Sequence, residues 1–520
     1  MSDQSAVDEF PPGPTGLPVV GAMPYSVLGG LDFRERMAEE YGDIVHWETH
    51  RDHVYQLNDP EFIGHVLVHN NTNYVKGEQF QRLLGPLLGN GILNSEGEAW
   101  RRNRHLVQPS FHPDQIQRYA GMMTDLTEEM LDDWSDGQTR SIHDDMMELT
   151  LRIVSEALFG VDIDRYVDDI ETAVGDFLPA TTSLPNFLLP EEVPLPSRRR
   201  MSDARDTLDD VVDEIIQRKR RDPGEHDVVS KLLAASDDDG NSLSEKQIRD
   251  EAITLITAGH ETTAVSLTYT TYLLAQHPSV ESKLVAELDS VLGDEPPTMA
   301  DLPKLPYTEK VVKESMRLFP PVPGIVREAK STDEIGGYTI PAGSRMFMNQ
   351  WVVHRDGRWY DDPLAFEPER WTEEFERSLP PLAYFPFGAG PRRCIGDRFA
   401  MLEARLILAT VYRDYHLELV SDRNLEVVPT ITSRPDEEVR MKLHDRAPKR
   451  RPRRRGKRSA GESARSPKPV ASRAVRRRWH FMSAPDTYRI WKRRRGRYST
   501  SFRPSDEPRS RNASRRCSPN

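Results

Sequence analysis

The sequence has only two cysteines, Cys394 and Cys517, among its 520 residues. So few cysteines exclude a small scaffold held together by disulfides and favour a reducing compartment. The chain also lacks a charge-free apolar run of the roughly 18 residues that a membrane-spanning helix needs. Its first residues, MSDQSAVDEF, lack the basic and apolar regions of a secretory signal. We therefore expect a soluble cytoplasmic protein without a membrane anchor.

Lysine is also scarce, because only ten lysines precede Arg446. Residues 446–520 carry 26 basic and 4 acidic side chains, a net charge of +22. Of the 70 basic and 83 acidic side chains in the whole chain, this leaves 44 basic and 79 acidic ones in residues 1–445, a net charge of −35. An acidic body with few lysines is similar to proteins from salt-loving microbes, so we expect a halophilic protein. An ordinary acidic cytosolic enzyme is the alternative.

Hydrophobic residues make up 37% of the chain, and in the body they recur mostly at helical spacing. The longest predicted helix begins near Ser242 or Ser244, because Glu245 and Gln247 follow them three residues later, in the spacing of a capping box. It continues to about Gln276. At 1.5 Å per residue such a helix measures roughly 45 to 50 Å. It is therefore expected to cross the centre of the fold.

A polar notch, Ala258-Gly259-His260-Glu261-Thr262, interrupts the apolar middle of this helix. A glycine inside a helix costs about 1 kcal/mol relative to alanine, and a buried acid costs more unless it is paired. The hydroxyl of Thr262 can bond back to the carbonyl of Ala258 and open the helix locally. The notch indicates a functional polar site, the alternative being a tolerated kink with Glu261 facing solvent.

A second unusual segment is FGAGPRRCIG, residues 387–396. Three glycines and a proline within ten residues exclude the interior of a helix or strand and predict a tight loop. An amphipathic helix is predicted immediately after it, so the loop brings Cys394 to a helix N-terminus. The helix dipole, backbone amides, Arg392 and Arg393 are expected to lower the pKa of the thiol there. The resulting thiolate could bind a metal; a small buried hydrophobic cysteine is the alternative.

This loop resembles the haem-binding loop of the cytochrome P450 superfamily, Phe-x-x-Gly-x-Arg-x-Cys-x-Gly. Four further segments resemble motifs of the same family and follow its order along the chain. The residues that carry these four likenesses are Trp100 and Arg104, Ala258 to Thr262, Glu314 and Arg317, and Phe366 to Trp371, which includes Arg370. The resemblance spans about Pro11 to Asp445. It implies a mainly α fold with small β-sheets, a long central helix over the haem and the cysteine loop below it.

The resemblance also implies a role for each motif residue. Cys394 would be the axial ligand of the haem iron, and Thr262 with Glu261 would hold dioxygen and relay protons. The other haem contacts that it implies are Trp100, Arg104, Ala258, Arg327, Phe387, Arg392 and Gly396. Glu314, Arg317 and Arg370 would form a structural network that stabilises the haem-binding core. Without the resemblance, Glu314 and Arg317 would be read as an ordinary surface ion pair.

The same resemblance implies that the protein would be a prokaryotic monooxygenase that uses haem b to insert one atom of O2 into a C–H bond of a lipophilic substrate. The acid–alcohol pair, Glu261 and Thr262, favours dioxygen as the oxidant. No flavin or iron–sulfur module follows the body, so electrons from NAD(P)H are expected to arrive through a separate ferredoxin or flavoprotein reductase. The arginines expected on the electron-entry face are Arg101, Arg102, Arg393 and Arg398. The alternatives are a haem-binding sensor or carrier and a peroxide-driven peroxygenase.

Three largely apolar segments are expected, by the resemblance, to line the substrate site: Gly77–Leu93, Leu184–Pro196 and Pro323–Val326. Their composition favours a fatty acid, a terpenoid or an aromatic compound.

The C-terminal segment differs from the body in composition. It interleaves arginines with aromatic residues, as in VRRRWHF and IWKRRRGRY, which one hypothesis explains as nucleic-acid binding. We favour a disordered appendage and expect no nucleic-acid partner. A third hypothesis is translation out of frame. The predicted organisation is a haem monooxygenase domain at 1–445 and a basic extension at 446–520.

Overall fold

The computed structural model describes residues 10–16, 21–49, 52–161, 163–181, 193–224, 227–235 and 243–446. The predicted extension 446–520 lies outside these ranges except for Arg446, and the predicted loop Leu184–Pro196 lies outside them up to residue 192. The fold that follows is therefore that of the acidic body.

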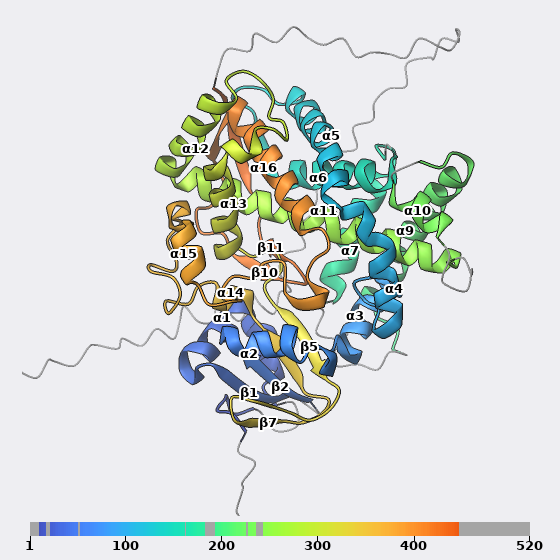
Figure 1. Cartoon of the computed structure of the whole chain (residues 1–520), viewed down its shortest axis with the longest axis vertical. Coiled ribbons are helices and arrows are strands. Elements are labelled where there is room, and N and C mark those ends of the chain that lie inside the picture. The colour runs from blue at the N-terminus through green and yellow to red at the C-terminus, as the bar shows by residue number, and fades with distance from the viewer. Residues whose placement is uncertain are drawn as a thin grey trace, which may run out of the picture. The chain divides into compact units, whose positions relative to one another are not determined.

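The described part of the chain is mainly helical, as predicted (Figure 1). Its α-helices are α1 (Met23–Tyr41), α2 (Pro60–Gly64), α3 (Gly77–Leu88), α4 (Gly97–Val107), α5 (Pro113–Asp132), α6 (Ile142–Phe159), α7 (Val167–Thr181), α9 (Pro196–Arg221), α10 (Val228–Ala234), α11 (Glu245–Gln276), α12 (Pro278–Val291), α13 (Pro306–Leu318), α14 (Gln350–Val353), α15 (Glu373–Ser378) and α16 (Asp397–Asp414). A short 3₁₀ turn, η6 (Gly390–Arg392), precedes α16. Within the described ranges, none of these helices is long and apolar enough to cross a membrane.

The β-strands form small sheets. They are β1 (Ile44–Thr49), β2 (Asp52–Leu57), β3 (Tyr74–Val75), β4 (Thr139–Ser141), β5 (Ile325–Ala329), β6 (Asp333–Ile335), β7 (Tyr338–Ile340), β8 (Arg345–Met348), β9 (Tyr415–Leu419), β10 (Val427–Pro429), β11 (Ser433–Pro435) and β12 (Arg440–Asp445). The largest sheet has the order β1-β2-β8-β5-β3, in which only β2 and β8 run parallel. The others are β4-β12-β9 and the hairpins β6-β7 and β10-β11.

The long helix α11 begins at the second of the two predicted N-caps. The hydroxyl of Ser244 accepts a hydrogen bond from the backbone N–H of Gln247, and the side-chain oxygen of Gln247 accepts one from the backbone N–H of Ser244. This reciprocal pair satisfies two backbone donors that a helix start otherwise leaves free. The helix ends at Gln276, as expected, and most of its residues from Ile248 to Leu274 are buried. It is therefore the central helix of the fold.

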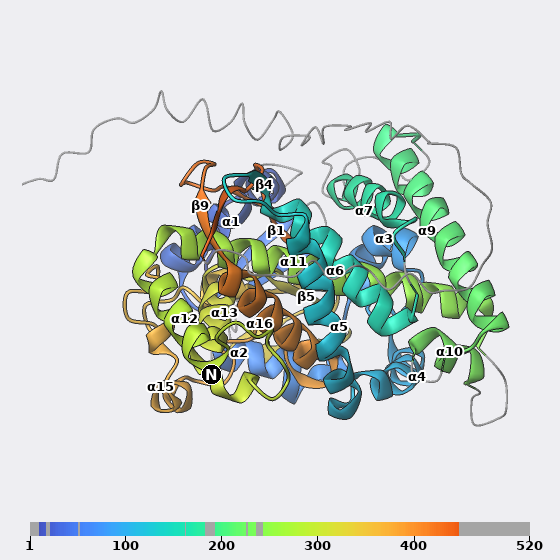
Figure 2. The same cartoon turned by 90° about the horizontal axis from the view of Figure 1, so that it is seen from above.

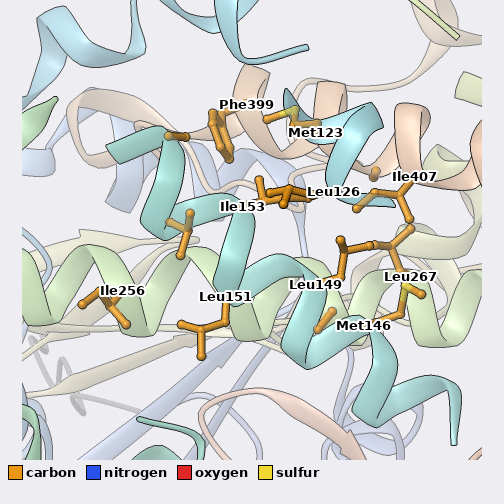
Figure 3. Packing of buried hydrophobic residues seen from close by; sticks show 14 of the residues in the cluster. Met123, Leu126, Met146, Leu149, Leu151, Ile153, Ile256, Leu267, Phe399 and Ile407 are labelled. Carbon is orange, nitrogen blue, oxygen red and sulfur yellow. The ribbon is translucent and has the colours of Figure 1, made fainter. Parts of the chain in front are cut away.

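Helix α11 is central because other helices pack around it. It contacts α6, α13 and α16, and α16 in turn lies beside α5, as Figure 2 shows. In Figure 3, Met146 and Leu149 of α6 belong to the same packed cluster as Leu267 of α11 and Ile407 of α16. Gly259 allows the close approach of α6, because a Cβ at this position would lie 2.7 Å from Cγ2 of Val154. The close packing of α6 against α11 thus explains why a glycine stands in the notch.

Candidate active site

Cys394 lies on the predicted tight loop, between η6 and the N-terminus of α16. Its backbone N–H donates a hydrogen bond to the carbonyl oxygen of Phe387, at 2.9 Å, which closes the loop. Gly390 has a φ of 66°, and a Cβ there would collide with the carbonyl oxygen of Leu67. Only glycine fits both conditions. We call residues 387–396 the thiol loop.

The thiol of Cys394 has accessible surface although protein surrounds it. The side chain is exposed, yet burial raises the pKa of the thiol, and the N–H of Gly396 together with Arg104 and Arg393 only partly opposes this rise. The lowered thiol pKa expected from the sequence is therefore wrong for this structure, because desolvation outweighs the helix N-terminus and the arginines. The thiol is therefore accessible and at the same time largely surrounded by protein.

A second exposed patch lies in the middle of α11. Ala258 is exposed and Thr262 is partly exposed, whereas Ile256 and Ala264, on the same helix, are fully buried. The Thr262 hydroxyl donates a hydrogen bond to the carbonyl oxygen of Ala258 at 2.9 Å, as the sequence predicts. The notch therefore leaves the Ala258 methyl group and the Thr262 side chain accessible on a helix that is otherwise mostly buried.

The thiol loop and the notch belong to elements that pack together. Helix α16, which follows the thiol loop, contacts α11, and its buried Glu403 lies beside Thr263 of α11. The thiol loop also touches β5, because a Cβ on Gly388 would lie 3.2 Å from Cδ1 of Ile325. The candidate site is therefore bounded by the thiol loop, the middle of α11 and the start of β5.

A cluster of buried cations gathers near the thiol loop. Arg392 donates to the carbonyl oxygen of Ser95 at 3.0 Å and forms an ion pair with Glu96. Burial and the charge of Arg392 lower the pKa of Arg327 to about 10. Burial, Arg327 and Arg392 likewise hold the pKa of Lys76 well below its ordinary value. One carboxylate, Glu96, acts on all three of these basic side chains.

The cluster of basic side chains and the accessible thiol of Cys394 both fit a haem group. Haem carries two propionate carboxylates, and buried carboxylates need cationic partners or donors. Within the described ranges, no three His, Cys, Asp or Glu side chains cluster as a metal site. A metal at Cys394 would therefore need ligands other than those that the described residues supply there, such as the four porphyrin nitrogens of a haem. The residues present fit the group.

The predicted haem contacts divide between two places. The guanidinium of Arg392 lies over the Trp100 ring, 4.6 Å from its centroid, which joins Trp100 to the cation cluster with Arg327. Arg104 instead donates to the carbonyl oxygen of Arg393 at 2.8 Å. It therefore lies beside the thiol loop, where the charge of Cys394 acts on it.

Glu261 points to a partner that the sequence did not predict. Its side chain is 1% exposed and accepts hydrogen bonds at 2.5 Å from the Thr432 hydroxyl and from Nε of Arg434. Burial alone would raise the pKa of this carboxyl, but Arg434, Thr432 and, to a lesser extent, His260 bring it below its ordinary value. The acid of the acid–alcohol pair is thus held ionised by the β10-β11 hairpin.

The structure brings Glu314, Arg317 and Arg370 together. Arg317 donates to both carboxylate oxygens of Glu314 at 2.8 Å, and Nε of Arg370 donates to Oε1 at 2.9 Å. The indole N–H of Trp371 and the backbone N–H of Glu367 add bonds of 2.9 and 3.0 Å. Glu314 and Arg317 are both completely buried. This is an interior network that ties α13 to the segment before the thiol loop, and not a surface pair.

The four arginines expected on the electron-entry face differ in their surroundings. Arg101, Arg393 and Arg398 are exposed, and Arg102 is partly buried. Arg101 pairs with Glu98, and Arg393 pairs with Asp397 at 2.8 Å. Two of the four charges are therefore partly neutralised within the chain.

The expected substrate segments surround the site to different degrees. Gly77–Leu93 forms α3 and a turn whose Asn90 and Ile92 backbone N–H groups donate to Asp250 and Glu251 of α11, at 2.9 and 3.0 Å. Pro323–Val326 leads into β5, beside the thiol loop. Leu184–Pro196 lies largely outside the described residues.

Three residues of the site were missed from the sequence. Lys76 is one of only ten lysines in the body, and this scarcity was a usable signal. No signal in the sequence pointed to Thr432 and Arg434, because they lie 171 and 173 residues from Glu261 along the chain.

Comparison with known proteins decides the family. A model of the cytochrome P450 family matches residues 11–439. The chain belongs to the cytochrome P450 family. This P450 is 37% identical to cyclooctatin synthase of Streptomyces melanosporofaciens over 407 residues, which are 76% of this chain and 88% of that protein. It is 30% identical to pentalenene oxygenase of Streptomyces avermitilis over 453 residues, 86% of this chain and 100% of the relative.

A solved structure supports the fold assignment. The P450 resembles retinoic acid bound cyanobacterial CYP120A1 with a TM-score of 0.75 and 27% sequence identity, and the match covers 84% of this chain and 99% of the other. The expected P450 fold is thus confirmed, and the bacterial relatives fit the expected prokaryotic type. The protein is a haem-dependent monooxygenase of the oxidoreductase class. Its cofactor is haem with a cysteine thiolate ligand, and NAD(P)H supplies electrons through a redox partner.

Replacing Lys76 by methionine is expected to weaken haem binding by about tenfold to a hundredfold, the range of roughly 1.5 to 3 kcal/mol for one hydrogen bond to a charged group. The variant keeps a long apolar stem beside Phe80, whose ring lies 4.7 Å from Nζ. Transfer of haem to an apoprotein acceptor measures the affinity. Lys330→Met, at an exposed lysine, is the control; equal haem retention in both variants would contradict the role of Lys76.

Proposed function

We propose that Cys394 is the thiolate ligand of this P450 and that Lys76, Trp100, Arg327 and Arg392 hold the haem propionates. The observation that carries the assignment is an accessible thiol, largely surrounded by protein, close to a cluster of three basic side chains that share the carboxylate of Glu96. When bound, the haem supplies oxygen-activating chemistry, and a thiolate ligand favours O–O cleavage.

The remaining thiol-loop residues are proposed to shape the ligand. The carbonyl of Phe387 fixes the Cys394 backbone, and the N–H of Gly396 donates to the sulfur. Such donors stabilise the charged form of a thiolate. Arg104, held by the carbonyl of Arg393, adds a positive charge beside the sulfur. These contacts orient the ligand and tune it.

On the opposite side of the proposed haem site, the notch of α11 would handle dioxygen and protons. Ala258 offers a small apolar surface, which leaves room for the cofactor. The Thr262 hydroxyl is proposed to exchange its bond to the Ala258 carbonyl for a bond to dioxygen, and to pass protons on. Glu261 is proposed to take protons from the surroundings and hand them to the Thr262 side.

The proposed reaction is insertion of one oxygen atom from O2 into a C–H bond of a lipophilic substrate. Ala258, Ile325 and Val326 are apolar and at least partly exposed around the proposed site. The relatives named for cyclooctatin and pentalenene and the solved structure with retinoic acid support an apolar organic molecule.

Turnover with labelled oxygen tests this proposal. Purified holoenzyme, NAD(P)H, a ferredoxin and its reductase, and retinoic acid or a medium-chain fatty acid are incubated under ¹⁸O₂. We expect a product heavier by one labelled oxygen atom. Equal turnover with hydrogen peroxide alone would favour a peroxygenase, and haem binding without turnover of any lipophilic probe would favour a sensor or carrier.

The redox partner is proposed to be a separate ferredoxin or flavoprotein reductase that docks near Arg101, Arg102, Arg393 and Arg398. Arg393 is adjacent to the proposed iron ligand and exposed, which supports electron entry on this face.

We also propose that residues 1–445 are the complete catalytic domain and that residues 446–520 contribute nothing to it. Strand β12 ends at Asp445 and pairs with β9 and β4, and the family match ends at residue 439. A chain truncated after Asp445 is expected to retain the haem spectrum and the turnover rate of the full chain. A loss of either beyond about twofold would assign a function to the basic extension.

A halophilic setting is proposed from the net charge of −35 in residues 1–445. In about 1 M salt the screening length falls to roughly 3 Å, which relieves repulsion among surface carboxylates. We expect the melting temperature of the holoenzyme to rise steadily from 0.1 to 2 M KCl. A flat or falling curve would contradict halophilic adaptation.

A further inference from the structure

The segment between α3 and α4, residues 89–96, lies against the first half of α11; we call it the strap. The backbone N–H of Asn90 donates to Oδ2 of Asp250 at 2.9 Å, and that of Ile92 donates to Oε2 of Glu251 at 3.0 Å. The two acids are adjacent on α11 and at most 2% exposed. Two buried carboxyl groups of the central helix therefore bind alternate backbone amides of the strap.

Two glycines let the strap approach α11 this closely. A Cβ on Gly89 would lie 2.2 Å from the carboxyl carbon of Asp250, and a Cβ on Gly91 would lie 2.0 Å from Oγ1 of Thr254. Gly89 also has a φ of 52°, which residues with a side chain rarely adopt. A side chain at either position would push the backbone of the strap away from the helix.

Asp250 binds more than the strap. Its Oδ1 accepts a hydrogen bond from Nη2 of Arg205, on α9, at 3.0 Å, and its Oδ2 accepts one from Nζ of Lys246 at 2.7 Å. Arg205 also donates to the carbonyl oxygen of Leu87, at the end of α3. These bonds join three helices, α3, α9 and α11, that also contact one another. Asp250 is thus the residue through which the strap is fixed to α9 as well as to α11.

Glu251 is the weaker of the two anchors. Its Oε1 is buried and has no hydrogen-bond partner among the described residues. Burial raises the pKa of this acid to about 8, and Asp250 adds to the rise, whereas the Ile92 N–H and Arg102 partly oppose it. Glu251 is therefore mostly protonated near pH 7, and hydrogen bonds to a neutral acceptor are roughly half as strong as those to a charged one. Asp250, which also binds two cations, is the main anchor.

The other end of the strap is fixed to the cation cluster. The carbonyl oxygen of Ser95 and the carboxylate of Glu96 both accept hydrogen bonds from Arg392 of the thiol loop. The first end meets α11 about two turns before Ala258. Leu93, between the two ends, is partly exposed. The strap therefore runs from α11 to the thiol loop along one side of the proposed site.

We propose that Asp250, together with Arg205, is a positioning residue that fixes the distance between the strap and α11 and thereby limits the width of the substrate that the site accepts. The inference rests on the proposed function, in which the segment Gly77–Leu93 lines the substrate site. A slender lipophilic molecule fits beside Leu93 while the strap keeps its place. A bulky one would have to displace the strap from Asp250, and this costs the hydrogen bonds that hold it.

Two imidazoles of different width test this selection. N-decylimidazole and N-tritylimidazole offer the same ring nitrogen to haem iron, which imidazole commonly ligates, but one carries a slender chain and the other three phenyl rings. Their dissociation constants are measured on the full-length holoenzyme from the Soret shift that nitrogen ligation causes. We expect the wild type to prefer the decyl compound. In Asp250→Asn and in Arg205→Met the preference should fall by about tenfold or more, the effect of losing one hydrogen bond to a charged group.

Hydrogen exchange shows whether the variants loosen the strap. In Asp250→Asn the backbone amide of Asn90 should exchange about tenfold faster than in the wild type, because its acceptor is no longer charged. Arg199→Met and Asp210→Asn are matched controls at exposed positions of α9. They should change neither the exchange rate nor the preference between the two imidazoles.

A third variant displaces the strap without removing a charge. The methyl group of Gly91→Ala would collide with Thr254, so this variant should also lose the preference for the slender imidazole. Gly121→Ala is its control, because no atom lies within 4 Å of a Cβ at that position of α5. Should Asp250→Asn fail to retain haem, Gly91→Ala decides the outcome.

The results separate this inference from the proposed function. A variant that keeps the thiolate-type carbon monoxide spectrum and an unchanged preference, whether or not its Asn90 amide exchanges faster, overturns the role of Asp250 and leaves the monooxygenase intact. A wild type without that spectrum overturns the proposed function itself.

Discussion

Replacing Glu314 by alanine is expected to lower the free energy of unfolding by about 3 to 5 kcal/mol. This is the usual cost of removing one partner of a buried ion pair, because the other charge then stays buried without compensation. Arg317 is completely buried and would lose both of its carboxylate contacts. Arg370, Trp371 and the backbone of Glu367 would each lose an acceptor as well. With a total stability of roughly 5 to 15 kcal/mol for a typical domain, the variant should unfold partly and release haem.

Urea unfolding of the holoenzyme, followed by circular dichroism and by the haem absorption, measures this loss. Glu373→Ala is a matched control, because Glu373 also pairs with an arginine, Arg377, at 2.8 Å, but on the surface. Exposed pairs contribute at most about 1 kcal/mol. Equal losses in the two variants would mean that the Glu314 network does not hold the core together.

Replacing Thr262 by alanine is expected to uncouple the enzyme. The hydroxyl lies on the partly exposed face of the α11 notch, and its hydrogen bond goes to the carbonyl oxygen of Ala258 within the helix. Without this hydroxyl, proton delivery should fail and reduced oxygen should leave as hydrogen peroxide. We expect the product formed per NAD(P)H to fall by at least about tenfold, near the low end of general acid–base contributions.

The ratio of peroxide to hydroxylated product, at a fixed rate of NAD(P)H consumption, measures the uncoupling. Thr262→Ser should restore most of the coupling, since it keeps the hydroxyl. Thr270→Ala is the matched control, because Thr270 makes the same back-bond, to Ser266 at 2.7 Å, in a buried part of α11. Normal coupling in Thr262→Ala would remove Thr262 from the mechanism.

Features that depend on neighbouring residues were predictable from the sequence. Three such features are the capping box at Ser244, the end of α11 at Gln276 and the bond of Thr262 to Ala258. Each depends only on residues a few positions away in the sequence. The tight thiol loop was predictable for the same reason, because its glycines set the backbone locally.

Features that depend on distant residues were not predictable without the fold. Glu261 meets Arg434 only because β11 folds back against α11, and Lys76 joins Arg327 only because β3 pairs with β5 in the same sheet. The thiol pKa was predicted in the wrong direction, since helix dipole and arginines are visible in a sequence but desolvation is not. The effect of nearby charges on a pKa can be weighed against the effect of burial only when the whole fold is known.

The carbon monoxide spectrum of the reduced holoenzyme tests the central claim most directly, namely that Cys394 binds the haem iron as a thiolate. The wild type is predicted to show the strongly red-shifted Soret band of thiolate-ligated haem. Cys394→Ala should lose this band, whereas Cys517, outside the described residues, should be replaceable by alanine without effect. An unshifted band in the wild type, or a red-shifted band that survives in Cys394→Ala, would contradict the account.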